Sequence, residues 1–432
     1  MSIQEKAALA KKASIQLAAA PVAVKNQALS EIARSLSERQ AEIIQANTID
    51  LARSKEEQLA MPLLKRLNFD QSKINEVISG INSLIQLPDP VGTTLAATEL
   101  DDGLELYKVS CPIGVIGVIF ESRPDALVQI STLALKSGNA VLLKGGSEAR
   151  EANRILAEII REATAQAGIP AGWIQLLETR DDVKEMLKLD QYLDLIVPRG
   201  SNEFVRYIME NTSIAVLGHA DGICHCYVDA AADLKMALEL VIDAKTQYVA
   251  VCNATETLLV HRDIAPQFLP QLKAEMDLRQ VELVGCAETQ KIIEVGLATE
   301  EDWRTEYLDY KLSIKVVNSL QEAIDHINTY GSRHTDAIIT KSQENAAEFM
   351  NLVDSGNVFW NCSTRFSDGF RYGFGAEVGI STSKIHARGP VGLDGLVIYK
   401  YKLIGQGQVV ADYVNKTKTF KHVKLDKEFC LK

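Results

Sequence analysis

Cys252 is the residue of this sequence best suited to covalent chemistry, and it lies in the run QYVAVCNATETLLVH at 247–261. Apolar spacing predicts a helix over 234–245 and a strand over 255–261. Cys252 therefore falls on a short connection, where its sulfur can meet a ligand. A thiolate attacks carbonyl carbon well and leaves well afterwards, so the position suits acyl transfer. The alternative is a small buried apolar residue, as most free cysteines are.

Three more segments follow predicted strands and are polar or rich in glycine: FESRPD at 120–125, KGGSE at 144–148 and PRGSN at 198–202. Ligands of open α/β sheets bind at the carboxyl ends of strands. Lys144 would place an ammonium at such an end, and the two glycines after it let a ligand approach the backbone. We expect Ser147 and Ser201 each to cap a helix whose amino end favours phosphate. The pattern favours dinucleotide binding, with ordinary turn chemistry as the alternative, since GxGxxG is missing.

A run of histidine and cysteine, GHADGICHC at 218–226, raises the question of a metal site. Cys224, His225 and Cys226 are consecutive and run into apolar residues, so a strand would direct them to alternate faces. We therefore expect no metal here. The other histidines, including His334 and His386, are isolated in the sequence.

The elements that must position these residues alternate between strand and helix from residue 112 onward. Predicted strands lie at 115–120, 140–143, 173–177, 193–197 and 214–217, and predicted helices at 125–136, 148–167, 182–188 and 202–209. The alternation resumes after Cys252, with strands at 281–284, 313–317, 335–340 and 357–361 and helices at 266–276, 288–295, 320–329 and 342–353. Short apolar strands between helices predict parallel, doubly wound sheets.

The two ends of the chain differ from this pattern. Residues 1–87 have helical spacing, clearest at 27–54 and 71–87, with Pro62 and Pro88 as expected breaks. Residues 93–110 alternate around Asp101-Asp102-Gly103, which predicts a hairpin that could serve as an oligomerisation arm. Strand-like runs return at 396–403 and 408–411. From Lys416 onward six lysines stand against one Asp and one Glu, and we expect a disordered, solvated tail.

Composition excludes several classes of protein. The chain has 432 residues, 47% hydrophobic and 24% charged, which suits two or three globular domains. Its net charge of -11 argues against a general nucleic-acid or anionic-membrane binder. The polar start is unlike a signal peptide, and no apolar run is long enough to span a bilayer. Seven scattered cysteines are typical of reduced thiols in a cytoplasmic protein.

Five motifs together carry a resemblance to a known family. They are CPIGVIGVIFESRP at 111–124, LKGGSEA at 143–149, VCNATETL at 251–258, SGNVFWNCSTRFSDG at 355–369 and FGAEVGIST at 374–382. The sequence resembles the gamma-glutamyl phosphate reductases, part of the aldehyde dehydrogenase superfamily, over about residues 5–413. Residues from 414 on are expected to be an addition. The resemblance implies two doubly wound α/β domains plus a β-hairpin oligomerisation arm.

The implied domains are an NADP-binding domain at 1–218, a catalytic domain at 219–394, return strands for oligomerisation at 395–413 and a basic tail at 414–432. The NADP-binding domain would include the helical region and the hairpin.

The resemblance also implies roles for single residues. Cys252 matches the nucleophile, and Lys144 matches the lysine at the adenosine ribose, which can reach the 2′-phosphate of NADPH. Glu148 lies so near that phosphate that we expect it to point away, or to be shifted in position by the extra glycine before it. The expected cofactor-binding residues are Lys144, Ser147, Gly200, Ser201 and Glu306. The expected substrate-binding residues are Asn361, Ser363, Thr364 and Arg365, with a polar loop cap as the alternative.

Two positions depart from the superfamily pattern. Ser122 stands opposite the usual oxyanion asparagine, and Val216 opposite the usual general-base glutamate. We count Ser122 with Cys252 as a candidate catalytic residue. Since valine accepts no proton, Val216 argues against a hydrolytic aldehyde dehydrogenase. The intact set of Cys252, Lys144 and Glu306 argues against a member kept only as a scaffold.

The expected reaction is the NADPH-dependent reduction of L-glutamyl 5-phosphate to L-glutamate 5-semialdehyde, the second step of proline biosynthesis, through a Cys252 thioester. Expected partners are the small-molecule substrate, a functional link to glutamate 5-kinase and further copies of the chain in a homo-oligomer. We expect neither nucleic acid nor membrane as a partner.

Overall fold

The computed structural model of the chain describes residues 1–178 and 181–431. It has two compact units. The first comprises Met1–Gly200, Tyr207–Val216 and Gly392–Lys432, and the second comprises Ser201–Arg206 and Leu217–Val391. Within the described residues, no helix is both long and apolar enough to cross a membrane.

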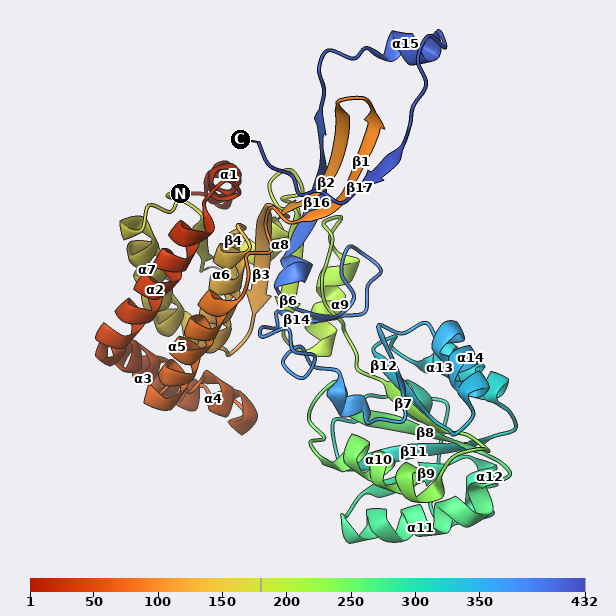
Figure 1. The fold of residues 1–432 in the computed structure, drawn as a ribbon. Coiled ribbons are helices and arrows are strands. Elements are labelled where there is room, and N and C mark those ends of the chain that lie inside the picture. Colours follow the sequence, from red (N-terminus) through yellow and green to blue (C-terminus); the bar gives the residue numbers. More distant parts are fainter. Residues whose placement is uncertain (179–180, 432) are drawn as a thin grey trace. The chain divides into compact units, whose positions relative to one another are not determined.

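Helices open the first unit, as the apolar spacing predicts (Figure 1, red to orange). They are α1 (Ile3–Leu17), α2 (Val22–Glu38), α3 (Gln40–Glu56), α4 (Met61–Leu67) and α5 (Gln71–Gln86). The helical pattern at 27–54 is divided at Arg39, whose side chain pairs with Glu42 and reaches Glu158 and Glu162 on α7. Pro62 lies in the first turn of α4, where proline is tolerated, so the expected break is in fact a helix start.

The first unit is built on a parallel sheet in the order β5-β4-β3-β6. Its strands are β3 (Val115–Phe120), β4 (Ala140–Gly145), β5 (Ile174–Leu177) and β6 (Leu195–Arg199). The helices after them are α6 (Pro124–Lys136), α7 (Arg150–Gln166), α8 (Asp181–Met186) and α9 (Asn202–Glu210). Every residue of β3 and β4 is buried, as expected of a strand covered on both faces. The strand predicted at 214–217 is only one bridge, between Ile196 and Val216.

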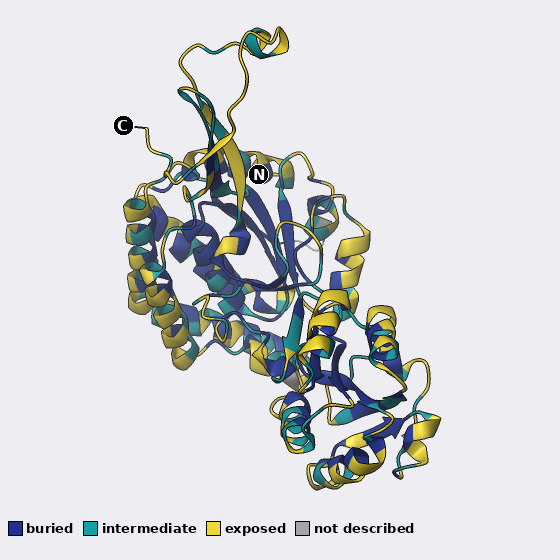
Figure 2. Cartoon of the chain, turned by 45° about the vertical axis from the view of Figure 1, so that its right-hand side comes forward, coloured by how far each residue is buried: buried dark blue, intermediate teal, exposed yellow. Residues whose placement is uncertain are grey.

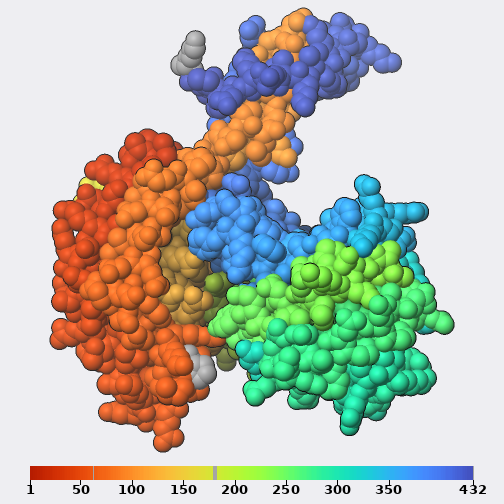
Figure 3. Space-filling model, turned by 60° about the horizontal axis from the view of Figure 1, so that its bottom comes forward, coloured from red at the N-terminus to blue at the C-terminus, as the bar shows by residue number. Residues whose placement is uncertain are grey.

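An antiparallel sheet forms the arm of the first unit, in the order β16-β2-β1-β17. The predicted hairpin is β1 (Thr94–Asp101) and β2 (Leu104–Pro112), turning at Gly103 with φ 67°, a left-handed conformation that glycine adopts easily. β16 (Val397–Ile404) pairs with β2 along its whole length. Figure 3 shows the hairpin, in orange, packed against the last part of the chain, in dark blue.

The basic end of the chain is ordered, contrary to our prediction. β17 (Val423–Leu425) pairs with β1, and Lys421 and Lys427 form ion pairs with Asp102 and Glu105 of the hairpin. The acidic hairpin therefore neutralises the lysines that suggested disorder. The strand expected at 408–411 is also wrong, because α15 (Val410–Val414) occupies this segment.

The second unit contains a parallel sheet in the order β10-β9-β11-β8-β7-β12-β13. Its strands are β7 (Cys224–Val228), β8 (Thr255–His261), β9 (Glu282–Gly285), β10 (Gly296–Leu297), β11 (Lys311–Val317), β12 (Thr335–Ile339) and β13 (Asn357–Trp360). Its helices are α10 (Leu234–Thr246), α11 (Ala265–Leu278), α12 (Ala287–Gln290), α13 (Leu320–Tyr330) and α14 (Gln343–Leu352). The helix expected at 288–295 is only the short α12. The strands β14 (Gly379–Ser381) and β15 (Gly389–Val391) pair separately.

Both faces of this second sheet are covered. Leu258 and Val260 of β8 pack into a cluster with α10 and α11, whereas Leu259 packs into a cluster with α13 and α14. Figure 2 shows the strands of the two parallel sheets mostly buried and the outer faces of the helices exposed. The predicted α/β class is therefore confirmed, and the carboxyl ends of the strands are where its ligands are expected.

Candidate active site

Cys252 lies on the connection between α10 and β8, and its side chain is partly exposed. The backbone beneath it is tightly packed. The Cys224 thiol donates to the Cys252 carbonyl oxygen at 3.1 Å. A Cβ built on Gly222 would lie 2.2 Å from that oxygen and 2.5 Å from the Cys252 Cα. The second unit thus presents the sulfur on a connection whose backbone position is fixed by its neighbours.

A buried ion pair joins the two elements on either side of the Cys252 connection. Lys245, near the end of α10, and Glu256, near the start of β8, lie 2.6 Å apart, and both side chains are fully buried. Burial raises the pKa of Glu256 to about 7, and the Lys245 ammonium opposes that rise. Burial likewise lowers the pKa of Lys245.

Arg365 brings a buried cation near the nucleophile. It lies in a single 3-10 turn, Thr364–Phe366, with only 8% of its surface exposed. Its Nε donates to the Gln247 side chain at 2.9 Å. Burial lowers its pKa, the Arg371 charge adds to this, and the charge of Cys252 opposes it. Within the described residues its two terminal nitrogens make no hydrogen bond, so they can bind an anion.

Gln247 and Arg371 were not among the predicted site residues. Arg371 donates to the Arg365 carbonyl oxygen, which fixes the turn that holds Arg365. The signals were present in the sequence, since Gln247 begins the Cys252 run and Arg371 follows the motif that contains Arg365. Neither shows its partner until the chain is folded.

The side chains of the other three predicted substrate residues already form hydrogen bonds within the protein. The Asn361 amide pairs with the Thr340 backbone, accepting from its N–H and donating to its carbonyl oxygen, both at 2.9 Å. Ser363 accepts from the Arg365 N–H, and the Thr364 hydroxyl lies 3.1 Å from that of Thr255. These contacts favour the loop-cap alternative, and substrate binding by the three residues stays a prediction.

Glu306 accepts hydrogen bonds from the Asn202 side chain and from the Gly222 N–H. Burial raises its pKa. Asn202 is the first residue of α9, directly after Ser201, whose carbonyl accepts from Val205 at 3.0 Å. The structure therefore brings Glu306, predicted at the nicotinamide ribose, beside the Ser201 helix start. Asn202 was not predicted, although it directly follows Gly200-Ser201.

Lys144 and Ser122 lie at the ends of neighbouring strands in the first unit. Lys144 is 6% exposed and donates to the Gly145 carbonyl oxygen. The Ser122 hydroxyl and N–H both donate to Glu148, the former at 2.8 Å. A Cβ on Gly146 would lie 2.0 Å from the Glu148 carboxylate, so glycine is needed for this carboxylate to turn back to Ser122. The Ser122 hydroxyl is thus already engaged within this unit.

The amino end of α7 corrects another expectation. Ser147 does not cap this helix; it begins a separate 3-10 turn, and α7 starts at Arg150. The cap is Asp50 of α3, whose carboxylate accepts from the Glu151 and Ala152 N–H groups at 3.2 and 2.8 Å. A carboxylate already occupies the end that was expected to favour phosphate. Burial raises the pKa of Asp50, and these N–H donors oppose the rise.

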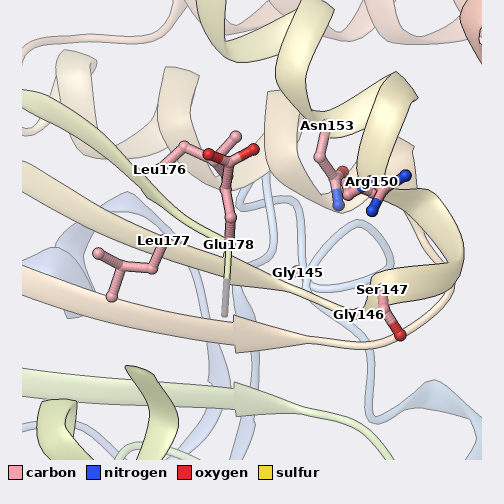
Figure 4. A pocket seen from close by; sticks show the side chains of 8 residues that line it. All are labelled: Gly145, Gly146, Ser147, Arg150, Asn153, Leu176, Leu177 and Glu178. Carbon is pink, nitrogen blue, oxygen red and sulfur yellow. The ribbon is translucent and has the colours of Figure 1, made fainter. Parts of the chain in front are cut away.

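A pocket opens at the carboxyl ends of β4 and β5 (Figure 4). Its empty volume is about 230 Å³, and Gly145, Gly146, Ser147, Arg150, Asn153, Leu176, Leu177 and Glu178 line it. Arg150 and Glu178 carry opposite charges here and pair outward with Glu151 and Arg154 at 2.8 and 2.7 Å. Arg150 and Glu178 were not predicted, because only the fold places strand β5 beside β4.

Two α/β units with a loop cysteine and a strand-end lysine are the arrangement of an aldehyde dehydrogenase. The sequence profile described as "Aldehyde dehydrogenase family" matches residues 1–291. The chain is 73% identical over 431 residues to the gamma-glutamyl phosphate reductase of Acetivibrio thermocellus, covering 100% of both sequences. It is 71% identical over 429 residues to that of Pelotomaculum thermopropionicum, covering 99% of both. The crystal structure of gamma-glutamyl phosphate reductase from Thermotoga maritima superposes with a TM-score of 0.92 at 43% identity, covering 94% of this chain and 99% of that one.

The chain belongs to the gamma-glutamyl phosphate reductase family, a branch of the aldehyde dehydrogenase family of oxidoreductases. This membership supports a nicotinamide cofactor. The expectation that residues from 414 on are an addition is wrong, since the Acetivibrio relative matches the whole chain.

Proposed function

We propose that the chain reduces L-glutamyl 5-phosphate to L-glutamate 5-semialdehyde with NADPH and releases phosphate, as the second step of proline biosynthesis. The observation that carries this proposal is Cys252 on a backbone fixed by its neighbours, with the buried Arg365 guanidinium near it. A thiol nucleophile beside an anion-binding group suits an acyl phosphate. The names of the full-length relatives support the substrate.

Acyl transfer to Cys252 is the proposed first step. The Cys252 thiolate attacks the 5-carbonyl carbon, a C–S bond forms, and the C–O bond to phosphate breaks with its electron pair leaving on phosphate. Arg365 is the proposed seat of the leaving phosphate, because its side chain is largely buried and its terminal nitrogens are able to donate. Arg123 is a weaker candidate, since it pairs with Asp125 at 2.9 Å. Bidentate guanidinium–phosphate contacts would stabilise the charge on the leaving group.

A dinucleotide is the proposed cofactor, and residues of each unit are its proposed contacts. Lys144 and the pocket beside it would hold the ribose and 2′-phosphate at the adenosine end, and Gly200 and Ser201 would meet the pyrophosphate at the start of α9. Glu306, oriented by Asn202 and Gly222, would hold the nicotinamide ribose. Ser147 and Ser122 remain proposed site residues. Because the Ser122 hydroxyl donates to Glu148, we propose that Ser122 acts by orienting the Glu148 carboxylate.

Reduction and release complete the proposed cycle. A nicotinamide held by Glu306 would supply the hydride that reduces the thioester carbonyl. The Cys252 N–H would stabilise the negative oxygen of the resulting thiohemiacetal. Its collapse re-forms the carbonyl and breaks the C–S bond, which frees the aldehyde and the Cys252 thiolate. Val216, 9% exposed and apolar, offers no base to activate water, so the thioester lasts long enough to be reduced.

Two partner proposals accompany this reaction. We propose that the arm of β1, β2, β16 and β17 joins copies of the chain in a homo-oligomer. Its support is a set of exposed apolar arm residues, namely Leu95, Ile398, Tyr399, Tyr401, Leu403 and Val423. We also propose glutamate 5-kinase as the functional link that supplies the acyl phosphate.

The test is NADPH oxidation by the purified chain with freshly prepared glutamyl phosphate. Cys252→Ala should lower kcat by at least ~100-fold, because loss of a nucleophile adds several kcal/mol to the barrier. NADPH affinity, measured by fluorescence, should change little. Cys286→Ser is the matched control, because Cys286 is also partly buried but lies after β9. A Cys252→Ala rate within a few fold of wild type would refute covalent catalysis.

A further inference from the structure

His219 and His334, which are far apart in the sequence, lie beside Cys252 in the folded second unit. One ring nitrogen of His219, one of His334 and the Cys252 sulfur lie within 4.8 Å of one another. His219 precedes β7, and His334 immediately precedes β12. The two rings meet edge to face, with centroids 4.8 Å apart. This trio differs from the consecutive Cys224, His225 and Cys226, which bond in turn to Cys252, Asp336 and Thr255.

Each of the two rings holds its Nδ1 against a protein oxygen. His219 Nδ1 lies 2.8 Å from the Ile380 carbonyl oxygen, which only accepts, so Nδ1 donates and Nε2 keeps the lone pair. His334 Nδ1 lies 2.8 Å from the Thr335 hydroxyl. His334 is fully buried, and within the described residues its Nε2 has no hydrogen-bond partner. Metal-binding histidines commonly hold their second nitrogen against a protein oxygen in this way.

An orphaned buried nitrogen needs an explanation, because it is costly to leave unsatisfied. A neutral ring with a spare lone pair is the form that binds a metal rather than the form that binds an anion.

The donor set selects the class of metal. Two imidazole nitrogens and one thiolate, with no carboxylate, suit a borderline-soft ion such as Zn²⁺ and not Mg²⁺ or Ca²⁺. Tetrahedral zinc with the usual bond lengths places such donor atoms about 3.3–3.6 Å apart. The ligand atoms of the trio, within 4.8 Å of one another, would therefore approach by about 1.2–1.5 Å at most, a side-chain adjustment. The nearby Arg365 charge opposes a cation, which favours reversible over permanent binding.

We infer that His219, His334 and Cys252 form a reversible inhibitory site for Zn²⁺, with the fourth position open to water. Bound zinc would hold the sulfur lone pair that acyl transfer requires, so the metal-loaded chain would be inactive until the metal leaves. An acylated Cys252 would lack the thiolate and could not bind the metal. The inhibitory part rests on the proposed function, whereas the binding part does not.

The binding test uses the full chain, stripped of metal by a chelator. Titration with Co²⁺ should give a thiolate-to-cobalt charge-transfer band that saturates at one ion per chain and disappears when Zn²⁺ is added. Cys252→Ser should remove the band, and His219→Ala and His334→Ala should each weaken binding at least tenfold. His326→Ala is the control, because His326 is another buried histidine with an unpartnered Nε2, packed instead against Trp303 and Tyr330. His219 is only partly buried, so His219→Ala decides the case if His334→Ala does not fold.

The inhibition test measures NADPH oxidation with Zn²⁺ and then with excess chelator. Zn²⁺ should abolish turnover, the chelator should restore it, and His219→Ala should require at least tenfold more Zn²⁺. A cobalt band retained in Cys252→Ser, or binding unchanged in His219→Ala, would overturn the site. If the metal-free chain failed to reduce glutamyl phosphate while the cobalt band followed the variants, the proposed function would be wrong and the metal site would stand.

Discussion

Gly222→Ala tests whether close packing positions the nucleophile. The new Cβ would lie 2.2 Å from the Cys252 carbonyl oxygen, 2.5 Å from its Cα and 2.6 Å from its Cβ. Such atoms essentially never come closer than 3.0 Å, so the backbones must separate by about 0.8 Å or more. These contacts are to backbone and to Cβ, so no flexible side chain can rotate to relieve them. The Gly222 N–H also bonds to Glu306, so the displacement would reach two proposed site residues.

The expected cost follows from this displacement. A misplacement of about 1 Å at a reacting group can lower the rate ~100-fold, which corresponds to about 2.7 kcal/mol of barrier. We expect kcat of glutamyl-phosphate-dependent NADPH oxidation to fall by about that factor while the chain remains folded. Stopped-flow measurement of the single-turnover rate would locate the loss in the chemical steps, and a thermal melt would report folding.

Gly80→Ala is the matched control for this variant. Gly80 lies inside α5, and a Cβ there would meet nothing within 4 Å. Removing a glycine from a helix interior should stabilise the fold by roughly 0.5–1 kcal/mol and leave kcat unchanged. If Gly222→Ala turned over within threefold of wild type, the Cys252 backbone would not need its present position, and the packing argument would fail.

Two further predictions concern the cofactor and the acyl intermediate. Lys144→Ala should weaken NADPH more than NADH, because its ammonium is proposed to pair with the 2′-phosphate; equal losses in fluorescence titrations with the two cofactors would reject that role. Oxidation of glutamate semialdehyde with NADP should require added phosphate, since Val216 cannot activate water, and an equal wild-type rate without phosphate would mean that another group does so.

Most strands of the two parallel sheets could be predicted from the sequence because their signal is local. β3 and β8 match the predicted ranges to the residue, since their apolar runs are bounded by polar or glycine-containing turns. The failures occur where a distant partner decides the outcome. Arg39 ends α2 while reaching glutamates on α7, and β17 forms because the acidic hairpin pairs with its lysines. Such partners leave no mark on local periodicity.

The site residues also divide into those with a local sequence signal and those whose role depends on a distant partner. Cys252 was predictable because its residue type and its place on a connection are both local, and Arg365 because its motif carried the family resemblance. The Asp50 cap of α7 was not, because Ser147 looked like the cap and Asp50 is far away in the sequence. His334 looked isolated for the same reason, although the fold places it beside His219 and Cys252. The nucleophile could be predicted from its residue type, whereas the residues around it could be identified only once the fold was known.

The buried Lys245–Glu256 pair shows what the fold adds to Cys252. Burial drives both pKa values toward the neutral forms, so the pair is a poor source of stability. The ion pair does join α10 to β8, the two elements that the Cys252 connection links. Glu256 also accepts from the Leu308 N–H at 3.2 Å, two residues beyond Glu306. The pair therefore ties the nucleophile's connection to the segment that holds the proposed ribose contact. Rigid placement of a thiol relative to a hydride donor lowers the barrier more than extra stability would, which gives a physical reason to keep two charges in this core.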